Sequence, residues 1–325
     1  MQVPILKTLR KIPGGVMIIP LLIGAAMNSF CPQVLEIGGF STAMFKTGIN
    51  AFVALFFVCS GSQIKIKEAA LPLAKGTVLL ISKFAVGAIL GLLISKIWGM
   101  AGVLSITPLA VVSAATNSSG TLYVALAQEY GDNSDVAAIG PLCLNDSPFL
   151  TMLFFGAAGL ADIPLLSLLA AILPLLLGML IGNLDSDFRK LLEPGTAIIT
   201  PFVAFALGAN LRLQAILSAG VGGIILGLMT VLFTGIGGYY AIAVCNHGKP
   251  KAVGAAIGSC AGICSATPMY IAQIDPSLVP YVEASTASCT AATIITAILC
   301  PVLVAFLSRV DKKREQKRLN QTVEA

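Results

Sequence analysis

The sequence predicts an all-α membrane protein of about ten transmembrane helices. These helices form two inverted five-helix repeats, and the discontinuous fourth and ninth helices cross at mid-membrane. Composition is the first observation behind this prediction: the 325 residues are 57% hydrophobic and 11% charged, with a mean hydropathy of +0.92. The second is a series of apolar segments close to the roughly 20 residues that a helix needs to cross a bilayer. The third is that the second half of the chain repeats the first, with an odd number of such segments in each half.

Each apolar segment is expected to be helical, because a bilayer core has no water to satisfy irregular backbone unless protein or a cavity surrounds it. The first segment follows Lys7, Arg10 and Lys11 and could be a signal peptide. Its copy at residues 172–184 is internal and cannot be cleaved, so we expect a span. The predicted spans are residues 14–31, 42–60, 73–97, 103–130, 135–160, 164–182, 195–210, 217–245, 250–273 and 279–308.

The repeat is visible in paired motifs. IIPLLIGAAMNSF (18–30) matches ILPLLLGMLIGNL (172–184), with Pro20 and Pro174 at the same place and an offset of 154 residues. With five spans in each unit, the second copy must begin on the opposite side of the membrane, an arrangement typical of secondary transporters. We therefore divide the chain into a first repeat (1–161), a second repeat (162–310) and a basic cytoplasmic tail (311–325). The other matched pairs are FVALF (52–56) with FVAFA (202–206), SQIKIK (62–67) with ANLRLQ (209–214), and SSGTLYVA (118–125) with CSATPMYIA (264–272).

The lysines and arginines place both ends of the chain in the cytoplasm. With the N-terminus inside, only Lys46, Lys96 and Arg212 of the 20 basic residues lie outside, and Lys83 falls within a span. The tail then lies beside the anionic inner leaflet. The net charge of +5 therefore indicates membrane lipids as its partner rather than nucleic acid.

The fourth and ninth predicted spans are too polar at their centres for plain helices. Thr267 followed by Pro268 is typical of a helix start, with the threonine as cap and the proline at the first helical position. Ser119 or Thr121 is expected to cap the corresponding half-helix in the first copy. The free backbone N–H groups of each new helix would suit an anion. The candidate substrate-binding residues are Thr116, Asn117, Ser118, Ser119 and Thr121 in the first copy, and Ser259, Ser265 and Thr267 in the second.

The alternative is that these small residues only let helices pack closely. Two such stretches at symmetric positions favour a paired, discontinuous site instead.

Three residues are candidates for ion coupling. A carboxylate such as Asp146, in the fifth span beside Asn145, is costly within a membrane and therefore suggests function. Burial would raise its pKa and let it carry a proton, although it could equally clamp the broken helices. Lys83 could neutralise Asp146, attract an anionic substrate, or extend to the membrane interface.

The remaining reactive residues do not suggest an enzyme. Cys260 and Cys264 are one helical turn apart, but no histidine or carboxylate joins them at ligand spacing, and His247 has no partner. The sequence contains no HExxH, Walker or nucleophile-elbow motif. We therefore expect neither a catalytic site nor a metal or other cofactor.

A set of motifs in consistent order resembles the 2-keto-3-deoxygluconate permease family, from about Ile12 to Arg309. Pro-Leu-Leu-x-Gly also occurs in both copies. The other motifs are IPGG (12–15), TNSSGTLY (116–123), SPFLTMLFFGAAGLA (147–161), IGNLD (181–185), FVAFALGANL (202–211) and SATP (265–268).

This resemblance implies a bacterial inner-membrane symporter, driven by protons, that takes up a sugar acid released from pectin. The family is similar to the bile-acid and sodium symporter fold, in which spans one, two, six and seven form a panel and the other six form a core. The chain departs from the family in its fifth span. There the family carries a glutamate one position before Asp146, where this chain has Asn145. A shift of one residue rotates a helical side chain by about 100°.

The leading prediction is therefore a proton-coupled symporter of 2-keto-3-deoxygluconate that works by alternating access. A sodium-coupled carrier of another small organic anion is the alternative, with Asn145 and the polar turn as oxygen ligands. A channel or a membrane-embedded enzyme is a third class, which the paired breaks and the lack of a hydrolytic constellation disfavour. No residue argues for a particular oligomeric state.

Overall fold

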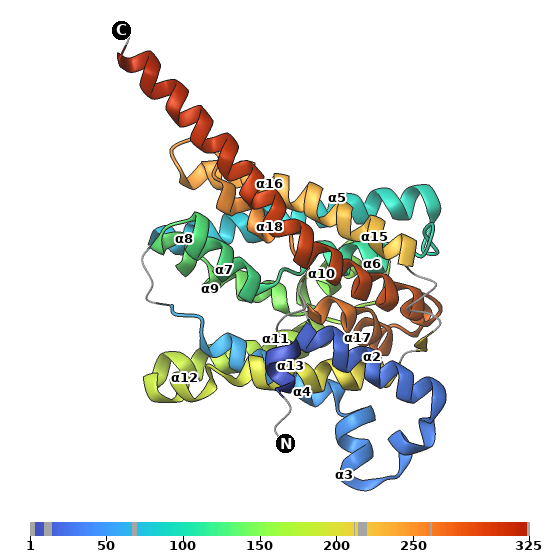
Figure 1. The fold of residues 1–325 in the computed structure, drawn as a ribbon. Helices are drawn as coiled ribbons and strands as arrows, with labels where there is room; N and C mark the ends of the chain where they lie inside the picture. The colour runs from blue at the N-terminus through green and yellow to red at the C-terminus, as the bar shows by residue number, and fades with distance from the viewer. Residues whose placement is uncertain are drawn as a thin grey trace.

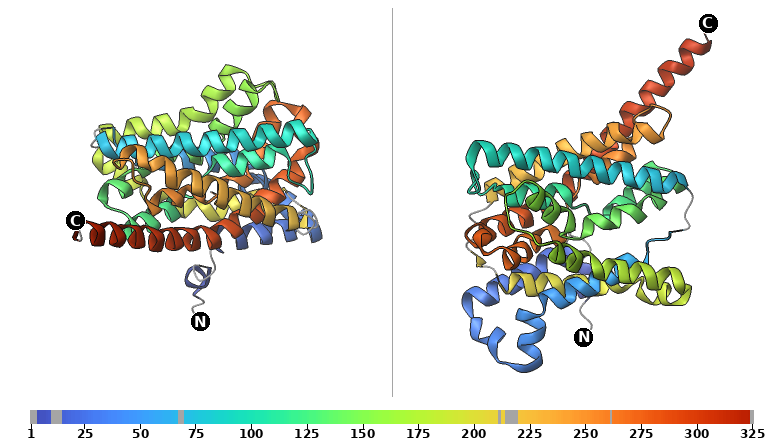
Figure 2. Two further views of the ribbon diagram at one scale, coloured as in Figure 1. Left: turned by 90° about the horizontal axis from the view of Figure 1, so that it is seen from above. Right: turned by 180° about the vertical axis from the view of Figure 1, so that it is seen from behind.

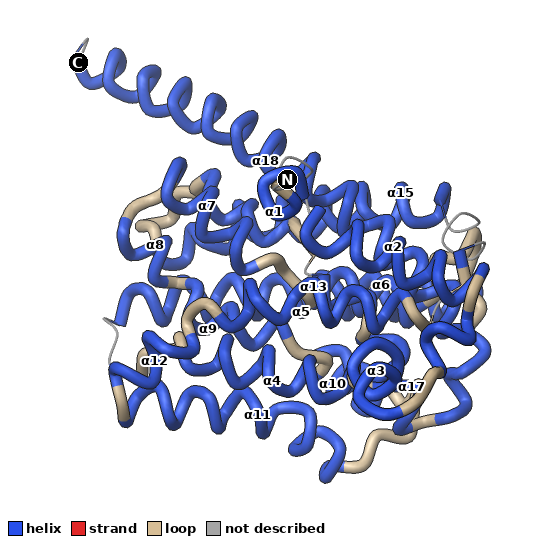
Figure 3. The backbone as a smooth tube through the Cα atoms, turned by 60° about the horizontal axis from the view of Figure 1, so that its bottom comes forward, coloured by secondary structure: helices blue, strands red, loops and turns tan. Residues whose placement is uncertain are grey.

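The computed structural model describes residues 4–9, 15–66, 70–210, 212–213, 220–260 and 262–323. The side chains of Met17, Ile18, Asp146, Glu315 and residues 317–323 lie outside this description. Over the described ranges, the β-type pairing is limited to an isolated bridge between Val103 and Ile106, and Figure 3 shows helices throughout. The all-α prediction is therefore confirmed for this part of the chain.

The described helices follow one another with short connections; the label η marks 3-10 and π-helical turns. The first half contains α1 (Ile5–Leu9), α2 (Gly15–Phe30), η1 (Pro32–Glu36), α3 (Gly39–Thr42), η2 (Ala43–Thr47), α4 (Ile49–Ser62), α5 (Ala70–Trp98), α6 (Pro108–Thr116), α7 (Gly120–Tyr130), α8 (Asn133–Ala137), α9 (Ile139–Leu142), η3 (Cys143–Asp146) and α10 (Phe149–Ala157). The second half contains α11 (Leu165–Leu184), α12 (Ser186–Leu192), α13 (Gly195–Gly208), α15 (Gly220–Met229), η4 (Thr230–Thr234), α16 (Gly235–Ala241), η5 (Ile242–Cys245), η6 (Ala252–Gly258), η7 (Gly262–Ser265), α17 (Thr267–Ile274), η8 (Pro276–Leu278) and α18 (Val279–Val323).

Five helical segments of the described chain are long and apolar enough to cross a membrane, and the number rises to nine if each of four bent pairs is one span. These nine segments coincide with the second to tenth predicted spans. The first predicted span falls on α2, whose apolar stretch Ile19–Phe30 is shorter. The count of ten spans therefore stays a prediction. The basic tail continues α18, which projects past the other helices in Figures 1 and 2.

The helices pack in two groups. We call residues 15–66 and 165–210 the panel: here α2 packs on α13, α4 packs on α11 and α13, and Leu21, Leu175 and Val203 share one apolar cluster. We call residues 70–162 and 220–323 the core, which has two apolar clusters of its own. The panel forms the lower layer in Figure 1 and the core the upper layer. This grouping of spans matches the one that the family resemblance implied.

The panel contains the same close helix crossing twice, at positions related by the sequence repeat. A Cβ atom on Gly61 of α4 would collide with the Leu175 carbonyl of α11. A Cβ atom on Gly208 of α13 would collide with the Leu21 carbonyl of α2. Leu21 and Leu175 are separated by the repeat offset, and each glycine directly precedes the paired motif that starts at residue 62 or 209. Glycine is required because the backbones approach so closely, as at small-residue interfaces of membrane helices.

Candidate functional site

The fourth span is broken where the sequence predicted. Thr107 caps α6 by accepting a hydrogen bond from the backbone N–H of Ala110 over 2.9 Å. The helix ends at Thr116, and the backbone is extended at Asn117 and Ser119. A new helix, α7, begins at Gly120 at an angle of 44° to α6. Ser119 is its cap, since its hydroxyl accepts from the Leu122 N–H over 3.4 Å.

The ninth span is also broken within the predicted stretch, and its second part begins at Thr267, as the Thr-Pro pair indicated. The 3-10 helix η6 ends at Gly258, Ser259 is extended, and α17 begins at Thr267 after the short turn η7. The cap of α17 is Ala266, so the prediction that Thr267 caps it was wrong. The Thr267 hydroxyl instead donates to the Ile263 carbonyl over 3.1 Å, the local bond to the previous turn that a threonine inside a helix can make.

The two breaks meet each other. The backbone N–H of Ser119 donates to the hydroxyl of Ser259 over 3.2 Å. Next to it, the Asn145 amide donates to the Ser118 hydroxyl over 3.0 Å, which joins the fifth span to the same crossing. From α5, the Lys83 ammonium donates to the carbonyl of Ser259 over 2.9 Å. These five predicted residues, far apart in sequence, therefore form one connected cluster.

The other predicted site residues have less uniform surroundings. The hydroxyl of Thr116 is buried and already hydrogen-bonded to the Val112 carbonyl and to Thr151, so it is fully occupied within the protein. Thr121 is exposed, with its hydroxyl 3.3 Å from that of Ser119. The side chain of Asp146 lies outside the described part of the structure. Its predicted role therefore stays a prediction.

Lys83 does not extend to the membrane interface, because its side chain is fully buried and its ammonium binds two carbonyls, those of Ile257 and Ser259. One of its three predicted roles was therefore wrong. The physical reason is that the end of η6 supplies oxygen partners at depth, so the side chain gains nothing by reaching for solvent.

Several buried oxygen atoms at the breaks have no hydrogen-bond partner among the described residues. Most buried polar groups in proteins are hydrogen-bonded, so such atoms mark places where a ligand can bind. An amide oxygen accepts from a sugar hydroxyl or coordinates a cation, whereas the free N–H groups of a helix start suit a carboxylate. The unpartnered oxygens at or beside the breaks are Ser113 Oγ, Asn117 Oδ1, Asn145 Oδ1 and Ser265 Oγ.

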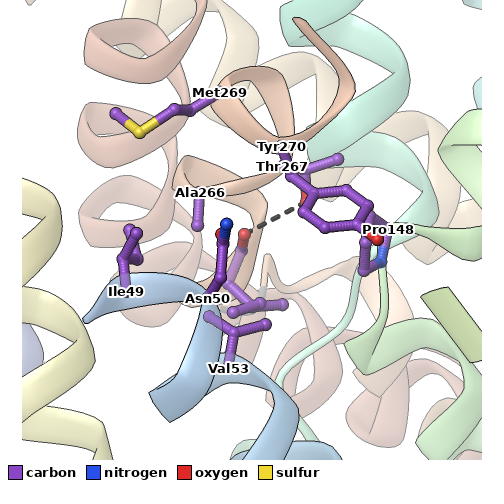
Figure 4. A pocket seen from close by; sticks show the side chains of 9 residues that line it. Ile49, Asn50, Val53, Pro148, Ala266, Thr267, Met269 and Tyr270 are labelled. Carbon is purple, nitrogen blue, oxygen red and sulfur yellow. Dashed lines mark hydrogen bonds between the residues drawn. The ribbon is translucent and has the colours of Figure 1, made fainter. Parts of the chain in front are cut away.

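A pocket lies between the panel and the core, beside the start of α17. Asn50 and Val53 of α4 line one part of it, and Thr267 and Tyr270 of α17 line another (Figure 4). Pro148, at the break in the fifth span, also lines it. Asn50 and Tyr270 were not among the predicted site residues. The available signal was an amide among the apolar residues of the second span.

A cluster of charges ties together one end of the core. Lys75 of α5 donates to the buried carboxylate of Asp135 over 2.6 Å, and Lys251, just before η6, binds Asp135 and Asp132. Although partial burial opposes ionisation, hydrogen bonds from Lys251 and Ser134 hold the pKa of Asp132 well below its ordinary value of 3.8. The cluster therefore fixes to α5 the ends of α7 and η6 that lie away from the two breaks.

Comparison with known proteins gives a consistent result. The model of the 2-keto-3-deoxygluconate permease family matches residues 6–313. The chain is 41% identical over 315 residues to 2-keto-3-deoxygluconate permease 1 of Salmonella typhimurium, covering 97% of this chain and 98% of that protein. It is 35% identical over 308 residues to the 2-keto-3-deoxygluconate permease of Enterobacter sp., covering 93% and 92%. It is 34% identical over 316 residues to that of Bacillus subtilis, covering 96% and 94%.

Proposed function

Because the chain belongs to the 2-keto-3-deoxygluconate permease family, and so to transporters rather than enzymes, we propose that it carries 2-keto-3-deoxygluconate into the cell by proton-coupled symport. The observation that carries this proposal is the contact between the two broken spans, Ser119 N–H to Ser259 Oγ. A small pocket between panel and core lies beside the start of α17. Discontinuous helices that meet inside a bundle are the usual binding sites of secondary transporters.

The chemistry of the cluster fits a sugar acid, which carries one carboxylate and several hydroxyl groups. The starts of α7 and α17 supply backbone N–H groups for the carboxylate. The unpartnered oxygens of Asn117 and Ser265 can accept from hydroxyl groups. The pocket lined by Asn50 and Tyr270 has a volume of about 10 Å³, room for one water molecule. In this proposal its amide and phenol reach the substrate only once panel and core move apart.

The proposed transport cycle moves the core against the panel, so that the pocket opens to one side of the membrane at a time. Two apolar clusters that lie wholly within the core support its movement as one unit. Two other clusters join panel and core, through Cys143 and Ile263 in one and Ala171 in the other, so their contacts would be remade during the cycle. We further propose that the halves are inverted repeats, which the duplicated glycine crossings of Gly61 and Gly208 support. In the proposed orientation, both termini face the cytoplasm from the bacterial inner membrane.

The proton carrier in this proposal is Asp146, the carboxylate of the fifth span. It follows Asn145, whose amide binds the broken fourth span. A carboxylate that is charged when it faces one side and protonated when it faces the other would couple proton entry to substrate entry.

One observation favours a second candidate, sodium coupling. The side-chain oxygens of Asn117 and Asn145 are both buried and unpartnered among the described residues, and amide oxygens are suitable ligands for a hard cation. Proton coupling remains our proposal because a carboxylate lies next to Asn145 in the sequence.

Uptake of radiolabelled 2-keto-3-deoxygluconate tests the substrate. Bacteria unable to take up this sugar acid should accumulate it when they express the chain, and excess unlabelled substrate should compete. Gluconate, which lacks the 2-keto group, serves as the control competitor. Cells that carry the protein in their membrane but accumulate no label would contradict the proposed function.

A further inference from the structure

Lys83 places a positive charge where the backbone of the ninth span leaves its helical path. Lys83 belongs to α5, and its side chain is fully buried. Its ammonium donates to the carbonyl of Ile257 over 2.5 Å and to that of Ser259 over 2.9 Å. Both carbonyls lie at the end of η6, where the next backbone N–H groups turn away.

The carbonyls of Ala255 and Ala256, in the last turn of η6, have partners of their own. The Cys300 thiol contacts the Ala255 and Ala256 carbonyls over 3.6 and 3.5 Å. The Ser259 hydroxyl also donates to the Ala256 carbonyl, over 3.3 Å. Lys83 donates to the carbonyls of Ile257 and Ser259. Without it, these two carbonyls would be left without a donor at membrane depth, at a cost of several kcal/mol each.

Such a group of carbonyls is also a site for a monovalent cation. The carbonyl end of a helix carries a partial negative charge, and unwound carbonyls of discontinuous helices coordinate sodium in transporters. A lysine ammonium is a compact unit charge with hydrogen-bond donors in several directions, so it can satisfy the same oxygens.

We propose that Lys83 is a tethered cation that takes the place of a bound sodium ion at the break of the ninth span. Through Ser259 it also positions the broken fourth span, because the Ser259 hydroxyl accepts from the Ser119 N–H. This inference rests on the proposed function in one respect only, namely that Ser119 belongs to the substrate site. Lys83 is a positioning residue: it organises the crossing of the two breaks and makes their geometry independent of external sodium.

The test removes the charged side chain of Lys83 and supplies a free cation in solution. Lys83→Ala leaves a cavity and two unpartnered carbonyls, which sodium or methylammonium can fill. Lys83→Met has a side chain of similar length without charge, so it fills the space and leaves no room for a cation. Lys96→Ala, at an exposed position of the same helix, is the matched control.

The readout is the thermal unfolding midpoint of purified protein in detergent, in sodium, methylammonium or choline chloride at equal ionic strength. We expect wild type and Lys96→Ala to unfold at the same temperature in all three salts. Lys83→Ala should unfold several degrees lower in choline and recover in a saturable manner with sodium or methylammonium. Lys83→Met should stay low in all three.

Two results would overturn the inference: a Lys83→Ala variant that neither small cation restores, or a Lys83→Met variant as stable as wild type. If Lys83→Ala folds in none of the three salts, the inference is overturned as well, because sodium or methylammonium at saturating concentration should restore the fold. Unfolding is measured without substrate, so a wild type that fails to transport 2-keto-3-deoxygluconate would defeat the proposed function and leave this inference standing.

Discussion

The backbone N–H of Ser119 donates to the hydroxyl of Ser259 over 3.2 Å, so that the breaks of the fourth and ninth spans touch inside the core. Neither break satisfies all of its own polar groups. Asn145 of the fifth span and Lys83 of the third span donate hydrogen bonds to some of these groups. Several oxygen atoms remain without a partner among the described residues. The crossing therefore combines a firm scaffold with unfilled hydrogen-bonding capacity, as a substrate site requires.

Replacing Asn117 or Ser265 by leucine should strongly weaken substrate binding without unfolding the protein. Each side chain has a buried oxygen without a described partner, so the substitution removes a contact to ligand. A hydrogen bond to a charged or polar ligand is worth about 1.5–3 kcal/mol, so affinity should fall by roughly 10-fold or more. Isothermal titration with 2-keto-3-deoxygluconate measures this fall.

Thr230→Val in the eighth span is the control, because its hydroxyl only bonds the Leu226 carbonyl of its own helix. Unchanged affinity in both leucine variants would remove the two turns from the site.

The glycine crossings of the panel should be intolerant of side chains. Gly61→Ala and Gly208→Ala each place a methyl group against a backbone carbonyl of the neighbouring helix, which cannot move aside cheaply. Overpacking of this kind costs about 1–3 kcal/mol, so both variants should unfold more readily, and by similar amounts. Gly220→Ala is the matched control, since no atom of the described residues lies within 4 Å of the added methyl group. Detergent-solubilised protein with an unchanged unfolding midpoint in either crossing variant would contradict the close approach.

The charge cluster at the end of the core predicts a pH dependence of stability. The pKa of Asp132 is lowered on folding, so its contribution to stability is present above its ordinary value of 3.8 and is lost as the pH falls toward the lower, folded pKa. Asp132→Asn should therefore lower the unfolding midpoint at neutral pH, and the difference from wild type should shrink below about pH 3.8. Lys190→Met, which removes an exposed ion pair with Asp187, is the control. A difference that is the same at pH 7 and at pH 3 would exclude this linkage.

The sequence alone predicted the second to tenth spans and both breaks, because bilayer length and mid-span polar residues leave few alternatives. The cap of α7 at Ser119 was also predicted correctly. The form of the chain before the ninth-span break was not predicted: η6 is a 3-10 helix of small residues, Ala252–Gly258, and Lys83 binds the carbonyl of Ser259 directly after it. Such bonds between distant residues leave no local pattern. The same holds for Asn50 and Tyr270, which become pocket neighbours only through the packing of α4 against the ninth span.

Asp146→Asn should separate binding from energy coupling. An amide cannot take up and release a proton, so the variant should exchange internal for external substrate but fail to accumulate it under a pH gradient. Counterflow in proteoliposomes measures exchange, and net uptake measures accumulation. Asn145→Asp with Asp146→Asn restores a carboxylate one position earlier and is the informative second variant. Full pH-driven accumulation by Asp146→Asn alone would place the proton elsewhere.

The ion that drives uptake is the most direct test of the proposed function. Purified wild-type protein in liposomes, given 2-keto-3-deoxygluconate with either a pH gradient or a sodium gradient, separates the two candidates. We expect concentrative uptake with an acidic exterior and no sodium, abolished by a protonophore, and no accumulation under a sodium gradient at equal pH. Accumulation that requires the sodium gradient and ignores the pH gradient would contradict proton coupling and assign the unpartnered oxygens of Asn117 and Asn145 to a sodium ion.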